Sequence, residues 1–231
     1  GIYGGTAQVY APNIMNLGDG YMSMVGMEYL LGINRDFTWG TPNIIEGWEL
    51  SDDARSMTLH LRPGLKLSDG YPFTSEDFMY FYDHVLTNKE LFPAYPSWAT
   101  VGGELVKFSA PDEYTVIMEF PVPNAAMANE LSLSAGNQPG ILWNFGTFQA
   151  AHFAKQFHPD FIGEEEATRK AKEAGFETWV EYYNHMNDTL FGLPLWPGTP
   201  PVMNAYVCVD RKMDRWIFQR NPYYWKVDSE G

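Results

Sequence analysis

The chain has 231 residues, of which 45% are hydrophobic, and a formal net charge of −14 at pH 7. This length and apolar content can bury a sizeable core in one or two domains, which excludes an intrinsically disordered chain. The acidic balance argues against nucleic-acid binding, because no basic patch is available to neutralise phosphates. No stretch of the sequence approaches the roughly 18 apolar residues needed to span a bilayer.

The first half of the chain is predicted to be rich in strands. Residues 1–45 read as a strand, a glycine-rich loop and a helix, and residues 46–145 as a β-rich subdomain with one or two helices. Within it, Met57, Leu59 and Leu61 alternate with polar residues. Alternation of this kind predicts a half-buried strand.

Two turns and a capped helix are predicted directly after this strand. Pro63-Gly64 interrupts the ladder, because proline lacks an N–H and glycine tolerates positive φ. Asp69-Gly70 is a second turn signal. Thr74 opens a Thr-Ser-Glu-Asp capping box that predicts a helix start, and apolar residues at helical spacings follow. We interpret this segment as scaffold, since functional residues favour loops on a rigid framework.

Residues 146–190 are predicted to be helical. An apolar face over residues 148–157 is expected to end at His158-Pro159-Asp160. Three glutamates then open a helix, because acids are favourable at the positive end of the helix dipole. That helix is expected to end at Gly175, a residue suited to the C′ position, and another is expected to begin at Thr178.

The chain is predicted to end in two strands, at residues 205–209 and 215–219. Cys208 lies in the first of them and is expected to act as a small buried hydrophobe. As the single cysteine, it excludes an internal disulfide. We interpret residues 46–145 as a subdomain inserted into a lobe built from residues 1–45 and 146–231.

The segment from Trp48 to Phe78 resembles a signature of extracellular solute-binding proteins, family 5. It reads Trp-Glu-Leu-Ser-Asp-Asp, then Met-Thr and Leu-Arg-Pro-Gly-Leu-Lys-Leu, then Asp-Gly-Tyr-Pro-Phe-Thr-Ser-Glu-Asp-Phe. These proteins capture oligopeptides, dipeptides or nickel for ABC importers. Residues 3–9 and 27–31 resemble the family's first strand and first helix. Residues 106–120 are similar to its strand pair around Asp-x-Tyr-Thr-Val, and residues 220–225 to its Arg-Asn-Pro-x-Tyr-Trp element.

The resemblance implies a mixed α/β (α+β) fold of the periplasmic-binding-protein-like type II, in which a hinge closes two lobes around a ligand. Family members are longer than this chain. We therefore expect a mature amino-terminal portion containing part of the first lobe (residues 1–45 and 146–231) and the small β-rich subdomain (46–145), with the second lobe missing.

The resemblance also places the ligand contacts in three loops, at residues 13–19, 95–98 and 203–204. The first two loops are expected on one exposed face, and aromatic rings there would supply contact area. Met15 stands at about the position where some peptide binders have an acidic residue, with Asp19 nearby. Recognition of a free peptide amino terminus is therefore not expected from this half of the cleft. The candidate ligand-binding residues are Asn16, Asp19, Tyr95, Trp98, Met203 and Asn204.

The chain is expected not to be an enzyme and to have no cofactor and no metal site. Its five histidines show no metal-ligand spacing, and no P-loop, dinucleotide or nucleophile motif is present. The expected partners are a peptide and a membrane ABC permease. The protein is expected to be a monomer outside the cytoplasm, either in the periplasm or on the outer face of the membrane as a lipoprotein. An oligosaccharide ligand is the alternative. A glycan-processing enzyme would need two carboxylates facing one cleft, and an interaction module would need an exposed apolar patch.

Overall fold

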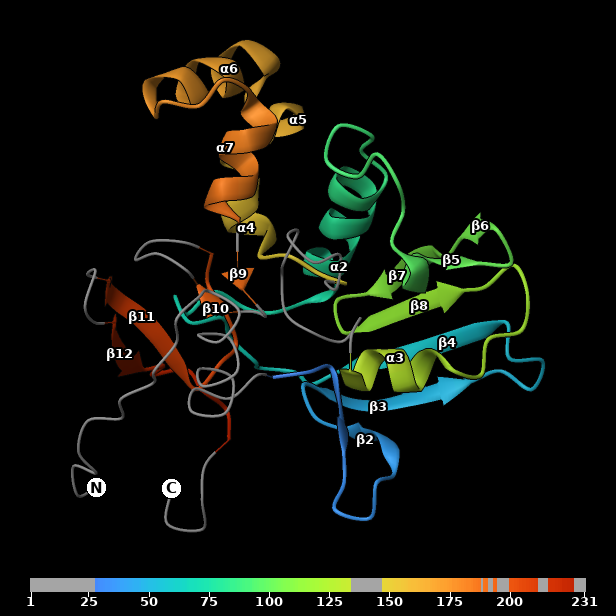
Figure 1. Cartoon of the computed structure of the whole chain (residues 1–231). Coiled ribbons are helices and arrows are strands. Elements are labelled where there is room, and N and C mark those ends of the chain that lie inside the picture. Colours follow the sequence, from blue (N-terminus) through green and yellow to red (C-terminus); the bar gives the residue numbers. More distant parts are fainter. Residues whose placement is uncertain are drawn as a thin grey trace, which may run out of the picture.

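The structure is a computed structural model that describes residues 28–133, 147–187, 189–190, 193–194, 200–211 and 216–226. It shows a mixed α/β arrangement in which a four-stranded antiparallel sheet, a central helix and a group of four helices follow one another across the molecule (Figure 1). A separate two-stranded ribbon, β11–β12, lies on the side away from the sheet (Figure 1). The mixed α/β class expected from the sequence is confirmed.

The strands fall into one larger sheet and several pairs. The four-stranded sheet has the order β3-β4-β8-β7, and the pairs are β1-β2, β5-β6, β9-β10 and β11-β12. The strand bounds are β1 (Leu31–Ile33), β2 (Trp39–Pro42), β3 (Ile45–Leu50), β4 (Ser56–Leu61), β5 (Thr100–Val101), β6 (Glu104–Leu105), β7 (Lys107–Asp112), β8 (Thr115–Glu119), β9 (Thr189–Leu190), β10 (Leu193–Pro194), β11 (Tyr206–Arg211) and β12 (Trp216–Arg220).

The helices are short. Their bounds are α2 (Ser75–Tyr80), η1 (Phe81–Leu86), η2 (Ser97–Ala99), α3 (Met127–Leu133), α4 (Ala151–Ala154), α5 (Pro159–Ile162), α6 (Glu164–Glu173) and α7 (Trp179–Met186). Helices α4 to α7 form a group apart from α3, which lies by the β1–β2 hairpin (Figure 1). Within the described ranges, no helix is long and apolar enough to cross a membrane.

The predicted strand around Leu59 is confirmed as β4. Met57, Leu59 and Leu61 are at most 1% exposed, whereas the residues between them are half-buried. β4 lies between β3 and β8, with Leu59 opposite Trp48 on one side and Val116 on the other. The alternating side chains therefore build the sheet's buried face.

The predicted capping box is confirmed at the start of α2. The Thr74 side chain accepts a hydrogen bond at the helix start, and Asp77 Oδ2 accepts one from the Thr74 backbone N–H at 3.0 Å. The helix continues through Leu86, but its second part, η1, is a π-helix, as in the 3.3 Å bond from the Thr87 N–H to the Tyr82 carbonyl. The sequence predicted the helix but not this wider winding.

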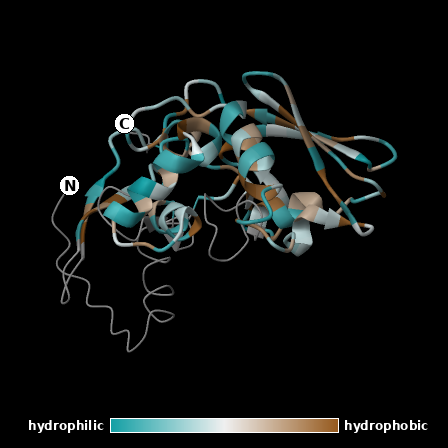
Figure 2. Ribbon diagram, turned by 90° about the horizontal axis from the view of Figure 1, so that it is seen from above, coloured by the Kyte–Doolittle hydropathy of each residue, from teal (hydrophilic) through white to brown (hydrophobic). Residues whose placement is uncertain are grey.

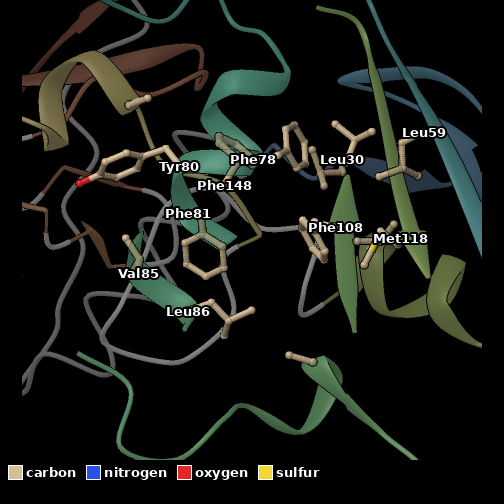
Figure 3. Close-up of a cluster of buried hydrophobic side chains, with 14 of the residues drawn as sticks. Leu30, Leu59, Phe78, Tyr80, Phe81, Val85, Leu86, Phe108, Met118 and Phe148 are labelled. Atoms are coloured by element: carbon tan, nitrogen blue, oxygen red, sulfur yellow. The ribbon is translucent and has the colours of Figure 1, made fainter. Parts of the chain in front are cut away.

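Apolar side chains of α2 and η1 form the centre of the core. Phe78, Phe81 and Val85 are at most 1% exposed, and they face the same cluster as Phe108 and Met118 of the sheet (Figure 3). The ribbon coloured by hydropathy shows hydrophilic and hydrophobic residues on the same helices, as expected for helices with one buried face (Figure 2).

The helical region differs from its prediction at one point. His158-Pro159-Asp160 does not simply end a helix: α4 ends at Ala154, and α5 begins at Pro159 with His158 as its N-cap. Proline suits this first helical position because its missing N–H has no helical partner there. The stop at Gly175 is confirmed, since Gly175 has φ +87° and the Phe176 N–H bonds the Ala171 carbonyl at 2.9 Å.

The predicted helix over residues 27–31 is wrong in its described part. Residues 28–30 are not helical, and Leu31 begins β1, where it pairs with Pro42. Leu30 and Leu31 are both fully buried, so their backbone groups need partners. Strand-type contacts supply them: Leu31 pairs with β2, and the Leu30 carbonyl accepts from the Ile45 N–H at 3.1 Å. The strand predicted at residues 3–9 lies outside the described residues.

The proposed division into residues 46–145 and the two flanking segments stays a prediction. The four-stranded sheet spans Ile45–Glu119, so it begins one residue before the expected subdomain and otherwise lies inside it. However, one cluster of buried residues extends from this sheet to Phe148, Tyr183 and Met203. Phe148, for example, packs with ring centroids 4.9 Å from Phe73 and 5.3 Å from Phe78.

The indole of Trp48 holds the β1–β2 hairpin to the sheet. Its Nε1 donates to the Gly40 carbonyl at 2.7 Å, and the Gly40 N–H donates to Ser132 Oγ of α3 at 3.0 Å. Gly40 has φ +74°, and a Cβ built there would lie 3.0 Å from the Trp48 ring. Gly64 has a similar φ of +82° but nothing within 4 Å of such a Cβ.

We expect Gly40→Ala to destabilise the protein more than Gly64→Ala. Both substitutions force a Cβ into the left-handed region, at about 1–2 kcal/mol, but only Gly40→Ala also pushes the ring that bonds its own carbonyl, which adds about 1–2 kcal/mol. Urea denaturation with an unchanged m-value measures the difference. Equal losses for the two variants would contradict this role of Trp48.

Asp77 is a buried carboxyl that connects α2 to α4. It is 3% exposed, and its Oδ1 accepts from the Ala151 N–H at 2.9 Å while its backbone carbonyl accepts from the Gln149 N–H at 3.1 Å. Burial raises the pKa of Asp77 from its usual 3.8 to about 7, and the hydrogen bonds that its carboxyl group accepts from the Ala151 and Thr74 backbone N–H groups offset this only partly.

The raised pKa of Asp77 predicts a loss of stability between about pH 4 and pH 7. Because the folded-state pKa lies above the unfolded one, the contribution of Asp77 is fully present below the unfolded pKa and is lost as the pH rises through the folded pKa. The free energy of unfolding of wild type minus that of Asp77→Asn should therefore fall over this window. Chemical denaturation at a series of pH values measures it.

The matched control is Asp53→Asn. The pKa of Asp53, an exposed turn residue, is lowered by its hydrogen bonds to the Ser51 side chain and the Arg55 backbone N–H. The contribution of Asp53 to stability is fully present above its unfolded-state pKa. The free energy of unfolding of wild type minus that of Asp53→Asn should therefore stay constant between pH 5 and pH 8. A flat profile for Asp77→Asn as well would refute the buried, proton-binding state of Asp77.

Candidate functional site

The segment expected to present aromatic ligand contacts is turned inward at Trp98. Pro96 is extended and precedes the single turn η2, in which the Ala99 N–H bonds the Pro96 carbonyl at 3.0 Å. This turn packs Trp98 against Phe108, with ring centroids 6.4 Å apart, and leaves Trp98 only 6% exposed. The expectation that Trp98 lies on an exposed face is therefore wrong: the ring belongs to the core.

Tyr95 is the more accessible ring of this segment. It is half-buried at the margin of the core, and the Lys89 ammonium lies 3.2 Å from its ring centroid. This is a cation–π contact, which stabilises the ring orientation by about 0.5–1 kcal/mol where solvent is close. One ring face is thus occupied by a cation in this structure.

Met203 and Asn204 lie in a packed connection between two parts of the chain. They are 1% and 0% exposed. The Asn204 carbonyl accepts from Asn221 Nδ2 at 2.9 Å, and the Asn221 N–H donates to the Ala205 carbonyl at 2.8 Å. The other end of the Asn221 amide, Oδ1, accepts from the Tyr223 N–H at 2.9 Å. The Arg220–Trp225 motif therefore uses its asparagine to fix the segment that carries Asn204.

The remaining two candidates, Asn16 and Asp19, lie outside the described residues. The structure thus brings Trp98 and Met203 into one buried cluster, with Tyr95 packed on its margin. The assignment of all six residues to ligand binding stays a prediction.

A buried carboxylate, Glu28, was missed by the sequence analysis. Glu28 is 5% exposed and accepts hydrogen bonds from Asn43 Nδ2 at 3.0 Å, from Lys226 Nζ at 2.6 Å and from the Tyr224 hydroxyl. Burial, followed by the contact with Glu28, raises the pKa of Tyr224. Glu28 and Tyr224 are 196 residues apart in the chain, so no local pattern could have revealed the group.

A second buried polar group connects α2 to α7. The Tyr80 hydroxyl lies 3.0 Å from the Tyr183 hydroxyl, which donates to Gln149 Oε1 at 2.6 Å. Since the Tyr183 proton is used for Gln149, Tyr80 donates to Tyr183. Burial raises the pKa of both tyrosines, so both hydroxyls keep their protons at neutral pH.

These groups favour a structural interpretation of the buried acids. Of the described carboxyl groups, Glu28 and Asp77 are the buried ones, and each is held by hydrogen bonds from named groups of the protein. An acid–base pair for glycoside hydrolysis needs one raised and one ionised carboxyl facing a common substrate. The hydrogen bonds of Glu28 and Asp77 instead join distant segments of the chain.

A family model for bacterial extracellular solute-binding proteins, family 5 (middle region), matches residues 41–230. The chain belongs to this family. The resemblance found in the sequence is thereby confirmed.

Curated relatives give the same classification. The chain is 32% identical over 193 residues to a periplasmic alpha-galactoside-binding protein of Rhizobium meliloti (strain 1021), an alignment that covers 82% of this chain and 23% of that protein. It is 29% identical over 204 residues to a probable ABC transporter-binding protein of Deinococcus radiodurans, covering 87% and 29%. The chain therefore spans about a quarter of the length of these relatives.

Solved structures confirm the expected periplasmic-binding-protein-like fold. An oligopeptide-binding protein, OppA, superposes with a TM-score of 0.77 at 28% identity, over 97% of this chain and 32% of that chain. The periplasmic binding protein MelB of Agrobacterium fabrum C58, solved in complex with stachyose, superposes with a TM-score of 0.60 at 23% identity, over 92% and 29%. The second likeness shows the fold alone. Each of these four proteins is named as a binding protein, and the Deinococcus protein is named as a probable ABC transporter-binding protein.

We expect Trp98→Ala and Tyr95→Ala to differ in their effect on stability. Trp98→Ala should lower the free energy of unfolding by about 3–5 kcal/mol, because it removes a core ring. Tyr95→Ala should lower it by about 1 kcal/mol, since it removes a half-buried ring and a cation–π contact. Urea denaturation of both variants checks this, and equal losses would show that Trp98 is not a core residue.

Proposed function

We propose that this chain is part of the solute-capture component of an ABC importer and that its cargo is a peptide. The observation that carries the proposal is membership of the family 5 solute-binding proteins over residues 41–230. The close superposition on an oligopeptide-binding protein supports peptide as the cargo class.

An α-galactoside oligosaccharide is the second candidate cargo. It is favoured by the 32% identical relative from Rhizobium meliloti, whose name states that it binds alpha-galactosides. The aromatic content of 16% agrees with either cargo, because ring faces pack against peptide side chains and sugars alike.

The proposed mechanism is closure of two lobes around the cargo, in which this chain supplies a rigid wall. Asn16, Asp19 and Tyr95 are proposed as direct contacts. Because Met203, Asn204 and Trp98 are buried, we propose that they contribute by holding the loops that line the cleft. The protein acts outside the cytoplasm as a monomer, has no catalytic activity, and delivers its cargo to a membrane permease.

The test is identification of the bound cargo. The natural full-length protein is purified without added ligand and denatured, and the released small molecules are identified by mass spectrometry. Peptides are the expected result. Isothermal titration with a pool of synthetic pentapeptides and, separately, with stachyose measures the two affinities directly.

The outcomes separate the two cargo classes. Binding of stachyose with no response to peptides would replace the first cargo with the second. Absence of any small-molecule binding, together with turnover of a glycan, would overturn the capture function itself. Tyr95→Ala should weaken binding of the true cargo by about 1 kcal/mol, whereas Asp53→Asn, in an exposed turn, should leave it unchanged.

A further inference from the structure

Two histidines and an aspartate meet between η1 and α5. Among the described residues, His84, His158 and Asp160 each offer one ligand-type atom, and these atoms all lie within 4.8 Å of one another. His84 Nδ1 is 2.7 Å and His158 Nδ1 is 3.7 Å from Asp160 Oδ2. His84 and His158 are 74 residues apart, so histidine spacing in the sequence could not reveal the group.

The hydrogen bonds of His158 determine which ring nitrogen carries its proton. His158 Nε2 lies 3.0 Å from the His84 carbonyl oxygen, which can only accept, so Nε2 is the donor. His158 Nδ1 then carries the lone pair, which accepts a long hydrogen bond from the Asp160 backbone N–H at 3.2 Å. A histidine that ligates a metal usually donates its other N–H to a carbonyl or carboxylate in this way. His158 is therefore held with its lone pair facing Asp160.

The surroundings combine one fixed ligand with two adjustable ones. The His158 side chain is 0% exposed, and the rings of Trp179 and Tyr183 pack edge-on against it at 5.3 and 5.5 Å. The side chains of His84 and Asp160 are 30% and 55% exposed. Solvent can therefore reach the cluster from one side, and these two side chains have room to rotate.

We propose that His84 Nδ1, His158 Nδ1 and Asp160 Oδ2 form a binding site for a divalent transition-metal ion of the zinc class. Zinc accepts imidazole nitrogen and carboxylate oxygen at about 2.0–2.2 Å, which places tetrahedral ligands about 3.3 Å apart. The separations of 2.7 and 3.7 Å lie on either side of this value. Small rotations of His84 and Asp160 complete the geometry, and water takes the fourth position.

The ion replaces the hydrogen between His84 Nδ1 and Asp160 Oδ2, and His84 then carries its proton on Nε2. It also takes the Nδ1 lone pair of His158, so the Asp160 N–H gives up its 3.2 Å hydrogen bond to that nitrogen. Bound metal joins η1 to α5, and so connects the core helix to the helical group. This role does not depend on which cargo the protein carries. Since the ion binds the folded state, it should raise the unfolding temperature.

The experiment titrates the full chain, without a histidine tag, with zinc chloride by calorimetry. The variants are His84→Gln and Asp160→Asn, whose side chains are partly exposed. The control is His60→Gln, because His60 Nε2 lies 3.8 Å from Glu49 Oε1 and forms an exposed pair that has no third metal-ligating side chain among the residues that the structure describes. Near-UV circular dichroism verifies that each variant is folded.

We expect wild type and His60→Gln to bind one zinc ion per chain with equal affinity, and both other variants to bind at least tenfold more weakly. Zinc should raise the unfolding temperature of wild type and His60→Gln only, and cobalt should give the visible absorption of a tetrahedral site in the same two proteins. Absence of zinc binding to wild type would overturn the proposal. So would zinc binding with wild-type affinity by folded His84→Gln and Asp160→Asn.

Discussion

The packing of α2 and η1 against the four-stranded sheet is the contact on which the rest of the structure depends. Phe78 and Phe81 of this helix belong to one buried cluster with Phe108 of the sheet and Phe148 of the following segment, so one set of apolar side chains joins both sides of the molecule (Figure 3). Burying such a ring stabilises a protein by about 1.5–3 kcal/mol relative to leaving it exposed. The sheet and the helical group are held together mainly by this shared apolar contact.

Polar connections between distant segments determine how the helix and the loops are oriented within that core. Asp77 connects the start of α2 to α4 by a hydrogen bond, and Tyr183 connects α7 to Tyr80 in the same way. Glu28 accepts hydrogen bonds from residues 224–226 and so connects them to the beginning of the described chain. Each group is buried, so leaving its partner unpaired would cost about 1–3 kcal/mol. These connections hold the loops in place, as the proposed role of one wall of a ligand-binding cleft requires.

Much of the fold could be predicted locally, and the candidate site much less so. The capping box at Thr74, the strand at Leu59 and the stop at Gly175 depend on residues within one or two turns of each other, and all three are confirmed. The helix expected at residues 27–31 was wrong in its described part because strand pairing outweighed local preference. Trp98 was expected on an exposed face because the resemblance places residues 95–98 in a ligand-contacting loop. An aromatic residue in the sequence indicates a large apolar ring but does not show whether that ring is buried.

The sequence by itself determined the family, the α/β class and the positions of most turns, because these follow from short motifs and from periods of two or 3.6 residues. Only the tertiary structure decided that Met203 and Asn204 are buried, that Glu28 meets Lys226, and that His84 meets His158. The physical reason is that burial and charge pairing depend on which segments meet in space. Those meetings join residues 74 to 198 positions apart, a separation over which no local pattern carries information.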